Sequence, residues 1–212
     1  MIEGLDRLMA PIGRIMRTAP VIPVLVIDDL AHAELVARAL VAGGLRVIEV
    51  TLRTPCALDA IRTMRGVEGA IVGAGTVTNP QELAASLDAG AEFIVSPGLT
   101  ERLGHAAREA GVPFLPGIAN ASDIMRGLDL GLTHFKFFPA MVSGGLTALK
   151  ALAAPFYQCN FCPTGGITAA TAAEWLAFEP VLCVGGSWVV PKGTPDTASI
   201  GPAARAATAL AR

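Results

Sequence analysis

The chain has 212 residues, a formal net charge of −2 and a pI near 5.9, and its mean hydropathy is +0.55. This charge provides no basic face for nucleic acids, and no apolar run reaches the roughly 18 residues of a membrane span. The first 17 residues carry Glu3, Asp6 and Arg7, so they lack the continuous apolar stretch of a signal peptide. We therefore expect a cytoplasmic protein.

Residues 1–17 are predicted to form an amphipathic helix, because their apolar residues recur at helical spacing. These residues are Leu5, Leu8, Met9, Ile12, Ile15 and Met16. After this helix, short apolar runs alternate with segments rich in alanine and leucine, a pattern typical of alternating strands and helices. Strands are expected at residues 21–27, 46–52, 70–75, 93–96, 114–116, 135–138, 161–163 and 182–184.

The helix boundaries repeat along the chain. Asp28 or Asp29 can cap the first helix after a strand, and Asn79 followed by Pro80 and Glu82 is a strong start signal. Glycines at 90, 111 and 131 each end a predicted helix, at intervals of about 20 residues, as a repeated βα unit requires.

Eight predicted strands, each followed by a helix, favour a single (β/α)8 TIM barrel over residues 1–212. Residues 1–17 would be the extra N-terminal helix, 21–191 the barrel core and 192–212 the region of the last helix. A doubly wound open sheet is the alternative, but it usually has fewer strands and one glycine-rich loop. Glycine or proline follows most strands here, which favours a barrel with its active site at the C-terminal ends of the strands.

Lys136 is the most informative residue of the chain. It lies among three phenylalanines in a predicted strand, and it is one of only three lysines. A buried ammonium is costly, but a desolvated lysine can lose its proton and attack a carbonyl to form a Schiff base. The alternative is a structural lysine whose amine extends to solvent.

Three polar residues near strand ends could act with this lysine. Glu49 lies in an apolar strand, where burial should raise the pKa of its carboxyl group toward neutrality, as a general acid–base requires. It could instead be only an ion-pair partner for Lys136 or for an arginine in the barrel interior. Arg53 could bind a carboxylate with two parallel hydrogen bonds or be an ordinary surface arginine. Thr76 could add a hydroxyl group.

Two glycine pairs follow the last two predicted strands. Gly165 and Gly166 follow Thr164, and Gly185 and Gly186 precede Ser187. In barrels the loops after strands seven and eight often bind phosphate through backbone N–H groups, and glycine allows that close approach. The alternative is that both pairs are only tight turns.

No metal-binding pattern is evident. The three histidines are scattered, and neither HxH nor HExxH spacing occurs. Cys159 and Cys162 match CxxC, but the second cysteine lies in an apolar run rather than at a helix start. We therefore expect reduced, buried thiols, no metal and no cofactor.

Several of these segments resemble the class I 2-keto-3-deoxy-6-phosphogluconate (KDPG) aldolase family. The resemblance covers about residues 20–191, and both termini follow the family only loosely. The matching segments are AGG at 42–44, IEVTLRT at 48–54, VGAGTV at 72–77, SPGLT at 96–100, FKFFP at 135–139, FCPTGGI at 161–167 and GGSW at 185–188.

The resemblance implies an aldolase with Lys136 as the Schiff-base lysine and Glu49 as the proton shuttle. It further implies that Arg53 and Thr76 hold the pyruvate carboxylate and that Pro97 and Phe138 shape the pocket. The phosphate would be held by Gly165, Gly166, Gly185, Gly186 and Ser187. Thr164 favours the gluconate-derived over the galactonate-derived substrate, and 4-hydroxy-2-oxoglutarate would be a second substrate.

The resemblance also implies a metal-independent homotrimer. Two other classes of function remain open on the residues themselves. One is a phosphate-binding isomerase or synthase barrel in which Lys136 acts only as a charge. The other is a barrel that binds a metabolite without catalysis.

Overall fold

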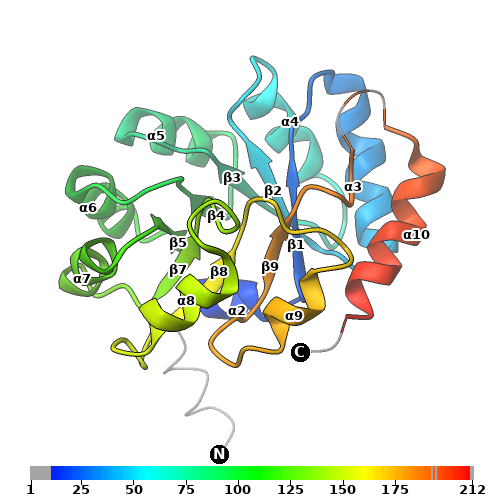
Figure 1. Ribbon diagram of the computed structural model, residues 1–212. Coiled ribbons are helices and arrows are strands. Elements are labelled where there is room, and N and C mark those ends of the chain that lie inside the picture. Colours follow the sequence, from blue (N-terminus) through cyan, green and yellow to red (C-terminus); the bar gives the residue numbers. More distant parts are fainter. Residues whose placement is uncertain (1–10, 192, 194, 211–212) are drawn as a thin grey trace, which may run out of the picture.

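The structure is a computed structural model that describes residues 11–191, 193 and 195–210 (Figure 1). Its strands are β1 (Val21–Leu25), β2 (Val47–Thr51), β3 (Ile71–Gly75), β4 (Phe93–Val95), β5 (Phe114–Leu115), β6 (Gly117–Ile118), β7 (His134–Phe137), β8 (Asn160–Pro163) and β9 (Val184–Gly186). Its helices are α2 (Pro11–Met16), α3 (Ala33–Ala42), α4 (Ala57–Met64), α5 (Pro80–Asp88), α6 (Glu101–Glu109), α7 (Ala121–Asp129), α8 (Gly145–Ala153), α9 (Ala172–Leu176) and α10 (Thr197–Thr208), with a 3-10 turn, η1 (Leu30–His32), before α3.

The strands form a closed parallel barrel. Six pair side by side in the order β5-β4-β3-β2-β1-β9, and three pair in the order β6-β7-β8. Pro116 alone separates β5 from β6, so these two make one barrel strand. Parallel bridges from Phe161 to Val181 and from Thr164 to Gly185 connect β8 to the β9 side. The prediction of a (β/α)8 barrel is therefore confirmed, and the open sheet is excluded.

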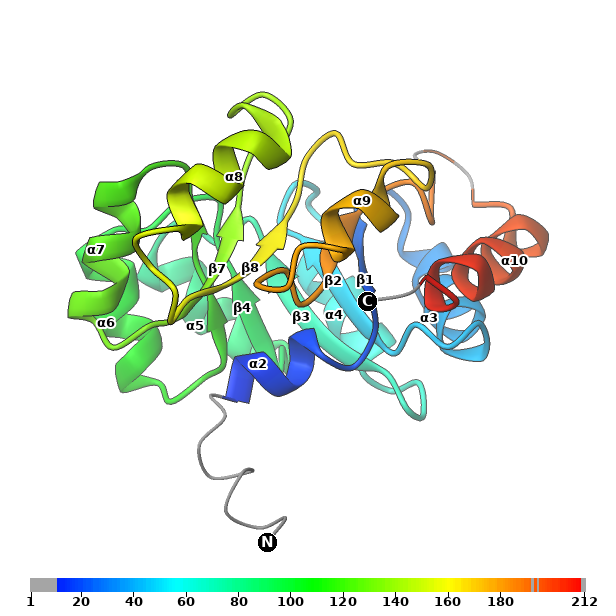
Figure 2. The same ribbon diagram turned by 60° about the horizontal axis from the view of Figure 1, so that its bottom comes forward.

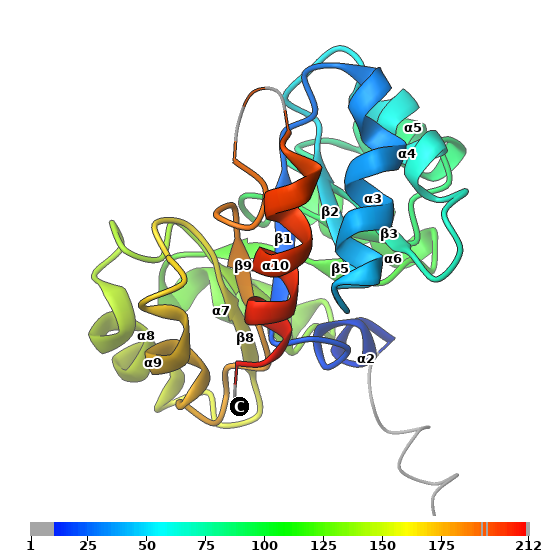
Figure 3. The ribbon, with the colours of Figure 1, turned by 90° about the vertical axis from the view of Figure 1, so that its right-hand side faces the viewer.

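The helices surround the barrel, as Figures 1 and 3 show. The last helix, α10, packs against α3. Gly43 makes this approach possible, because a β-carbon there would collide with the β-carbon of Ala204. The region predicted for the last helix thus completes the outer layer beside the first βα unit.

Most predicted helix boundaries are confirmed. Asn79 accepts a hydrogen bond from the Glu82 N–H at 2.9 Å, and Glu82 in turn accepts one from the Thr78 N–H at 2.7 Å. The glycines that end α5, α6 and α7 have φ values of +90°, +65° and +76°, the left-handed region in which glycine is favoured. Asp29, rather than Asp28, forms the first cap, and it starts η1.

Three strands differ by two or more residues from the prediction. The strand expected at 182–184 is β9, Val184–Gly186, because its pairing with β1 begins only at Val184, so Gly185 and Gly186 lie in the strand and not after it. The strand expected at 114–116 continues to Ile118, with Pro116 interrupting the ladder because proline has no N–H to donate. The Pro116 carbonyl still accepts a hydrogen bond from the Lys136 N–H at 2.8 Å. The first strand ends at Leu25 rather than residue 27.

Helix α2 closes the N-terminal end of the barrel (Figure 2). Its residues Ile12 and Met16 are buried against the inward side chains of the strands, including Phe93 and Leu115. Burying each such side chain stabilises the fold by roughly 1.5–3 kcal/mol. The predicted helix over 1–17 is thus confirmed for Pro11–Met16, and its first ten residues lie outside the described part of the chain.

The helices between residues 11 and 210 are short. The longest, α10, has 12 residues, whereas a membrane span needs roughly 20. Among the described residues, no helix is long and apolar enough to cross a bilayer.

Candidate active site

Lys136 and Glu49 form a buried ion pair inside the barrel. Lys136 on β7 donates from Nζ to Glu49 Oε1 on β2 at 3.0 Å and to Oε2 at 3.4 Å. Their side chains are only 5% and 4% exposed. The prediction that these two residues meet is confirmed, although they are 87 positions apart in the sequence.

The pair differs from the other buried polar residues of the described chain. The hydroxyl groups of Thr51, Ser86 and Ser96 each donate to a backbone carbonyl within hydrogen-bonding distance. Those bonds satisfy the groups and hold the backbone. Glu49 and Lys136 instead bond to one another, which leaves a carboxylate and an amine next to each other and close to the ends of their strands.

Small neighbours leave space around the Lys136 side chain. Its partners in register are Gly117 on β6 and Cys162 on β8. The ring of Phe138 lies on another side, with its centroid 5.4 Å from Nζ. A cation over a phenylalanine face gains roughly 0.5–2 kcal/mol, so this ring stabilises the charged amine.

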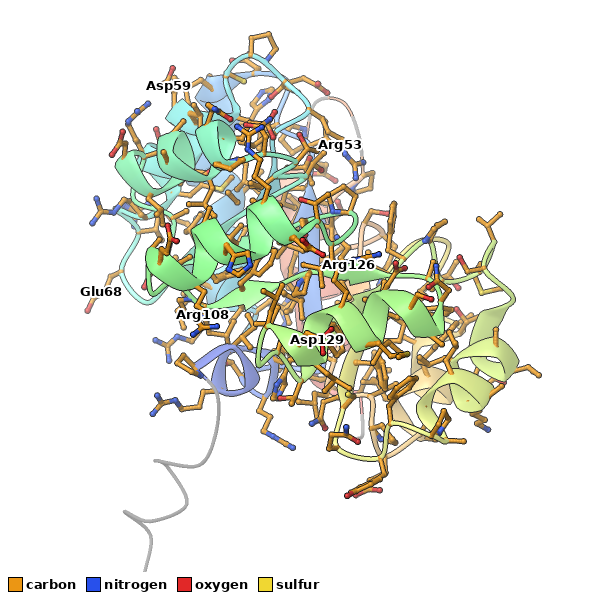
Figure 4. The ribbon with its side chains drawn as sticks, turned by 90° about the vertical axis from the view of Figure 1, so that its left-hand side faces the viewer. Arg53, Asp59, Glu68, Arg108, Arg126 and Asp129 are labelled. Atoms are coloured by element: carbon orange, nitrogen blue, oxygen red, sulfur yellow. The ribbon has the colours of Figure 1, made fainter. Side chains whose placement is uncertain are left out.

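Arg53 and Thr76 meet at the same end of the barrel. Arg53 Nε donates to Thr76 Oγ1 at 3.2 Å, and the guanidinium group is exposed. In Figure 4, Arg53 lies on the side of the molecule away from α2, where the strands end. The remaining N–H groups of the guanidinium could bind a carboxylate in two parallel bonds.

The backbone on both sides of this contact is constrained. Thr54 donates from its hydroxyl to the Ile27 carbonyl at 2.6 Å, which fixes the loop that carries Arg53. Thr76 itself has φ of +62°, the one non-glycine residue with positive φ among those described. A β-branched residue in this region is strained, and strain of this kind concentrates at functional sites.

Pro97 lies against β6, the neighbour of the lysine strand β7. A β-carbon at Gly117 would collide with the Pro97 carbonyl oxygen, so Gly117 lets the loop after β4 approach β6 closely. Because Gly117 is the register partner of Lys136, Pro97 and Lys136 are separated by only this strand. Pro97 is exposed at the end of the barrel.

The loop after β8 presents backbone donors. Gly165 and Gly166 have φ values of +104° and +80°, which glycine adopts without strain. Among the described residues, no backbone carbonyl accepts from either of their N–H groups. Successive N–H groups in such a conformation form a concavity suited to an anion.

The second glycine pair has a steric role as well. Gly185 and Gly186 lie within β9 and are buried, and Ser187 follows them at an exposed position. A β-carbon at Gly185 would collide with the Thr164 hydroxyl, and one at Gly186 would collide with the Trp188 ring. Gly185 therefore lets the barrel wall close against Thr164, and Gly186 leaves room for the Trp188 ring.

The cysteines and histidines show no ligand arrangement. Cys56, Cys159 and Cys162 are free thiols, and burial raises the pKa of the Cys159 thiol to about 11, which keeps it protonated at neutral pH. Among the described residues, no three His, Cys, Asp or Glu side chains are grouped so as to hold a metal ion.

A large surface groove lies at the opposite end of the barrel. Its volume is about 630 Å³, and it lies between α2 and the C-terminal ends of α6 and α7. Arg108 and Asp129, labelled in Figure 4, are among its lining residues. It is remote from the Lys136–Glu49 pair, so groove size alone does not locate the chemistry.

Sequence reasoning missed the steric role of three glycines that shape the site. Gly75, Gly117 and Gly185 lie within strands, and each leaves space for a group on another strand or loop. A glycine inside a strand often marks such a close approach. That rule could have selected these positions, but it does not say which group approaches.

A barrel with a buried amine beside a carboxylate at its C-terminal end has the architecture of a barrel enzyme that works through a lysine. Residues 12–202 match the family model described as KDPG and KHG aldolase. The chain is 58% identical over 204 residues to 2-dehydro-3-deoxy-phosphogluconate aldolase of Zymomonas mobilis, covering 96% of this chain and 98% of the relative. It is also 58% identical over 178 residues to KHG/KDPG aldolase of Escherichia coli, covering 84% of each chain.

Solved structures agree with the sequence matches. The Zymomonas mobilis aldolase crystallised with 3-phosphoglycerate superposes with a TM-score of 0.95, covering 96% of this chain and 98% of that one. KDPG aldolase from Legionella pneumophila, with pyruvate captured as a covalent carbinolamine, is 42% identical with a TM-score of 0.88, covering 95% and 98% of the two chains. This chain belongs to the KDPG and KHG aldolase family.

Proposed function

We propose that the chain is a class I aldolase that reversibly cleaves 2-dehydro-3-deoxy-6-phosphogluconate to pyruvate and D-glyceraldehyde 3-phosphate. The same 4-hydroxy-2-keto acid unit occurs in 4-hydroxy-2-oxoglutarate, which would yield pyruvate and glyoxylate. The observation that carries the proposal is the buried Lys136–Glu49 pair, 3.0 Å apart, in a chain of this family.

Lys136 acts as the nucleophile. Its neutral amine attacks the C2 ketone, and loss of water from the carbinolamine leaves an iminium ion. The iminium accepts the electron pair of the C3–C4 bond as that bond breaks, so the pyruvate half becomes an enamine and C4 becomes an aldehyde. Protonation of the enamine at C3 and hydrolysis of the resulting iminium release pyruvate and regenerate the amine.

Glu49 moves the protons in this sequence. Directly or through a water molecule, its carboxylate takes the proton of the C4 hydroxyl as the C3–C4 bond breaks. The carboxyl group can then return a proton to the enamine carbon. Its contact with Lys136 places the base next to the reacting carbons once the Schiff base has formed.

The other residues orient the substrate. Arg53 and Thr76 bind the carboxylate, which fixes the ketone over the amine and lowers the entropic part of the barrier. Pro97, Phe138 and Thr164 bound the pocket. The phosphate is held by backbone N–H groups after β8 and at the end of β9, namely those of Gly165, Gly166, Gly185, Gly186 and Ser187.

Assembly, location and metal use complete the proposal. We expect a homotrimer, as the family resemblance implies, and a cytoplasmic location. The mechanism needs only a lysine amine and a carboxylate, so EDTA should leave the turnover unchanged. Loss of activity that a divalent ion restores would contradict this.

Borohydride reduction in the presence of pyruvate tests the proposal most directly. The reduced pyruvyl adduct should appear on Lys136 in peptide mass spectrometry, and Lys150, which lies exposed on α8, serves as the internal control. An isomerase or synthase barrel, or a non-catalytic binding protein, would give no adduct at Lys136. Absence of the adduct would therefore refute the proposed function.

Glu49→Gln separates the proton transfer from Schiff-base formation. The variant should still form the adduct but should exchange the methyl protons of pyruvate about 100-fold more slowly, within the range that general acid–base catalysis contributes. Unchanged exchange would remove Glu49 from this role.

The sugar-acid preference needs a separate assay. Cleavage of the gluconate-derived and galactonate-derived substrates should be compared side by side at equal concentration. Buried Thr164 is expected to favour the gluconate compound, and a Thr164→Val variant should narrow the difference. Equal rates for the parent enzyme would contradict this preference.

A further inference from the structure

Gly75 occupies a position that determines where the Glu49 carboxylate can lie. Gly75 is the last residue of β3, and it pairs in register with Thr51 on β2, two residues beyond Glu49. The Glu49 side chain leans along the strand toward this glycine, as side chains in strands commonly do. The carboxylate therefore rests against the bare α-carbon of Gly75.

The space at Gly75 is filled by Glu49 itself. A β-carbon at this position would lie 2.6 Å from Glu49 Cγ and 2.7 Å from Cδ, and it would collide with Oε1. Oε1 is the same oxygen that accepts the 3.0 Å hydrogen bond from Lys136 Nζ. The missing side chain of Gly75 thus makes room for the oxygen that contacts the lysine.

Backbone conformation does not explain the glycine. Gly75 is absent from the positive-φ glycines of the described chain, so an alanine could adopt its φ and ψ. The requirement is only for space. Gly73, two residues earlier on β3, is similar in this respect, but its missing β-carbon faces the Phe93 ring in the barrel interior.

We propose that Gly75 is a positioning residue for proton transfer, which acts by holding the Glu49 carboxylate against Lys136 without touching the reactants. The inference rests on the proposed function. An alanine at 75 would push Oε1 away by roughly 1 Å to reach an ordinary contact distance. A displacement of this size in a reacting group can reduce the rate by about 100-fold.

The first experiment uses Gly75→Ala with pyruvate. Exchange of the pyruvate methyl protons should slow by about 100-fold, while borohydride trapping at Lys136 should proceed to the same extent as in the parent enzyme. Parent-like exchange in the variant, or equal loss of trapping and exchange, would overturn the inference. If the parent enzyme itself formed no adduct, the proposed function would fail. That result differs from both outcomes that would overturn the inference about Gly75.

A second variant tests whether a shorter side chain at position 49 compensates for the added methyl group at position 75. Aspartate is one methylene shorter than glutamate, so Gly75→Ala combined with Glu49→Asp relieves the collision. Exchange in the double variant should exceed exchange in Gly75→Ala, although Glu49→Asp alone should slow the parent enzyme. A purely structural role for Gly75 predicts instead that the two losses accumulate.

Gly73→Ala is the matched control in the same strand. It creates a collision with an aromatic ring rather than with Glu49. It should lower the unfolding temperature and reduce trapping and exchange together, without the selective loss of exchange. A selective loss in Gly73→Ala as well would show that any bulk on β3 has this effect, and it would overturn the inference.

The free energy of unfolding gives a readout of the Lys136–Glu49 ion pair that does not depend on catalysis. In the parent background, Glu49→Gln and Lys136→Met should be strongly coupled in a double-mutant cycle of unfolding free energies. In the Gly75→Ala background, this coupling should be lost because the carboxylate has moved. Undiminished coupling would show that Glu49 keeps its place, and the inference would then be wrong even if activity had changed.

Discussion

The Lys136 amine and the Glu49 carboxylate are 3.0 Å apart inside the barrel, and neither side chain is more than 5% exposed. A buried pair of this kind is strongly coupled, because removing one partner leaves the other charge without compensation. We expect Lys136→Met to lower the free energy of unfolding by about 3–5 kcal/mol.

Replacing both partners should recover most of this loss. In Lys136→Met combined with Glu49→Leu, no buried charge remains and the volume is filled by apolar groups. Urea unfolding of the two single variants and the double variant measures the difference. Independent, additive losses would contradict the strong coupling that the geometry predicts.

Substituting Arg53 should affect substrate binding. Arg53→Lys keeps the charge but loses the two parallel N–H bonds that a guanidinium makes to a carboxylate. Loss of about 1.5–3 kcal/mol of binding energy corresponds to an increase in KM of roughly 10- to 100-fold. Steady-state kinetics measures this, with Arg62→Lys as a control, because Arg62 pairs with Asp59 on the exposed face of α4.

Thr76 should show opposite effects on stability and activity. Its φ of +62° costs roughly 1–2 kcal/mol, and glycine would relieve this while adding about 0.5–1 kcal/mol of unfolded-state entropy. Thr76→Gly should therefore unfold at the same or a slightly higher temperature.

The same Thr76→Gly variant removes the hydroxyl group that Arg53 contacts, so its KM should rise about tenfold. Thr76→Ser, which keeps the hydroxyl group, should retain the parent KM. A Thr76→Gly variant that is clearly destabilised would show that the threonine backbone is not strained.

His134 should make the stability depend on pH. Burial, together with the positive charge of Arg17, lowers the pKa of His134 from 6.5 to about 4. Between these values the unfolded chain binds a proton that the folded chain does not, so the free energy of unfolding falls as the pH decreases through this window. The free energy of unfolding is therefore unaffected by this group above about pH 6.5, and it has fallen by at most about 3 kcal/mol once the pH is below about 4.

Urea unfolding at several pH values between 4 and 7 tests this dependence. His134→Asn should flatten the slope in that range, whatever its effect on stability at neutral pH. His105, which is exposed on α6, provides the control, because His105→Asn should leave the slope unchanged. If the slope of unfolding free energy against pH were unchanged in His134→Asn, other titrating groups would be responsible for the pH dependence of stability.

The sequence predicts much of the fold because local signals repeat. Every βα unit has its own strand, and several, such as those of α5, α6 and α7, also have a capping side chain and a terminal glycine, so the barrel follows from counting eight units. The interruption at Pro116 was not predicted, since the strand continues past a residue that cannot donate to the ladder.

The pairing of Lys136 with Glu49 was also predictable, because two isolated charges in apolar strands need partners. The steric roles of Gly75, Gly117 and Gly185 were not. Each depends on which group on a neighbouring strand or loop reaches across the barrel, and that depends on register and shape that no local pattern specifies.

Helix α2 has a consequence for the order of events during turnover. Ile12 and Met16 fill the N-terminal end of the barrel, so substrate and both products share the opening at the other end. In the proposed mechanism, the pyruvate fragment is tethered at the deeper position, on Lys136, when the C3–C4 bond breaks. The aldehyde must therefore leave first, and kinetics should show ordered product release. In product-inhibition experiments, pyruvate should compete with the substrate for the free enzyme, whereas the aldehyde should bind the enamine form.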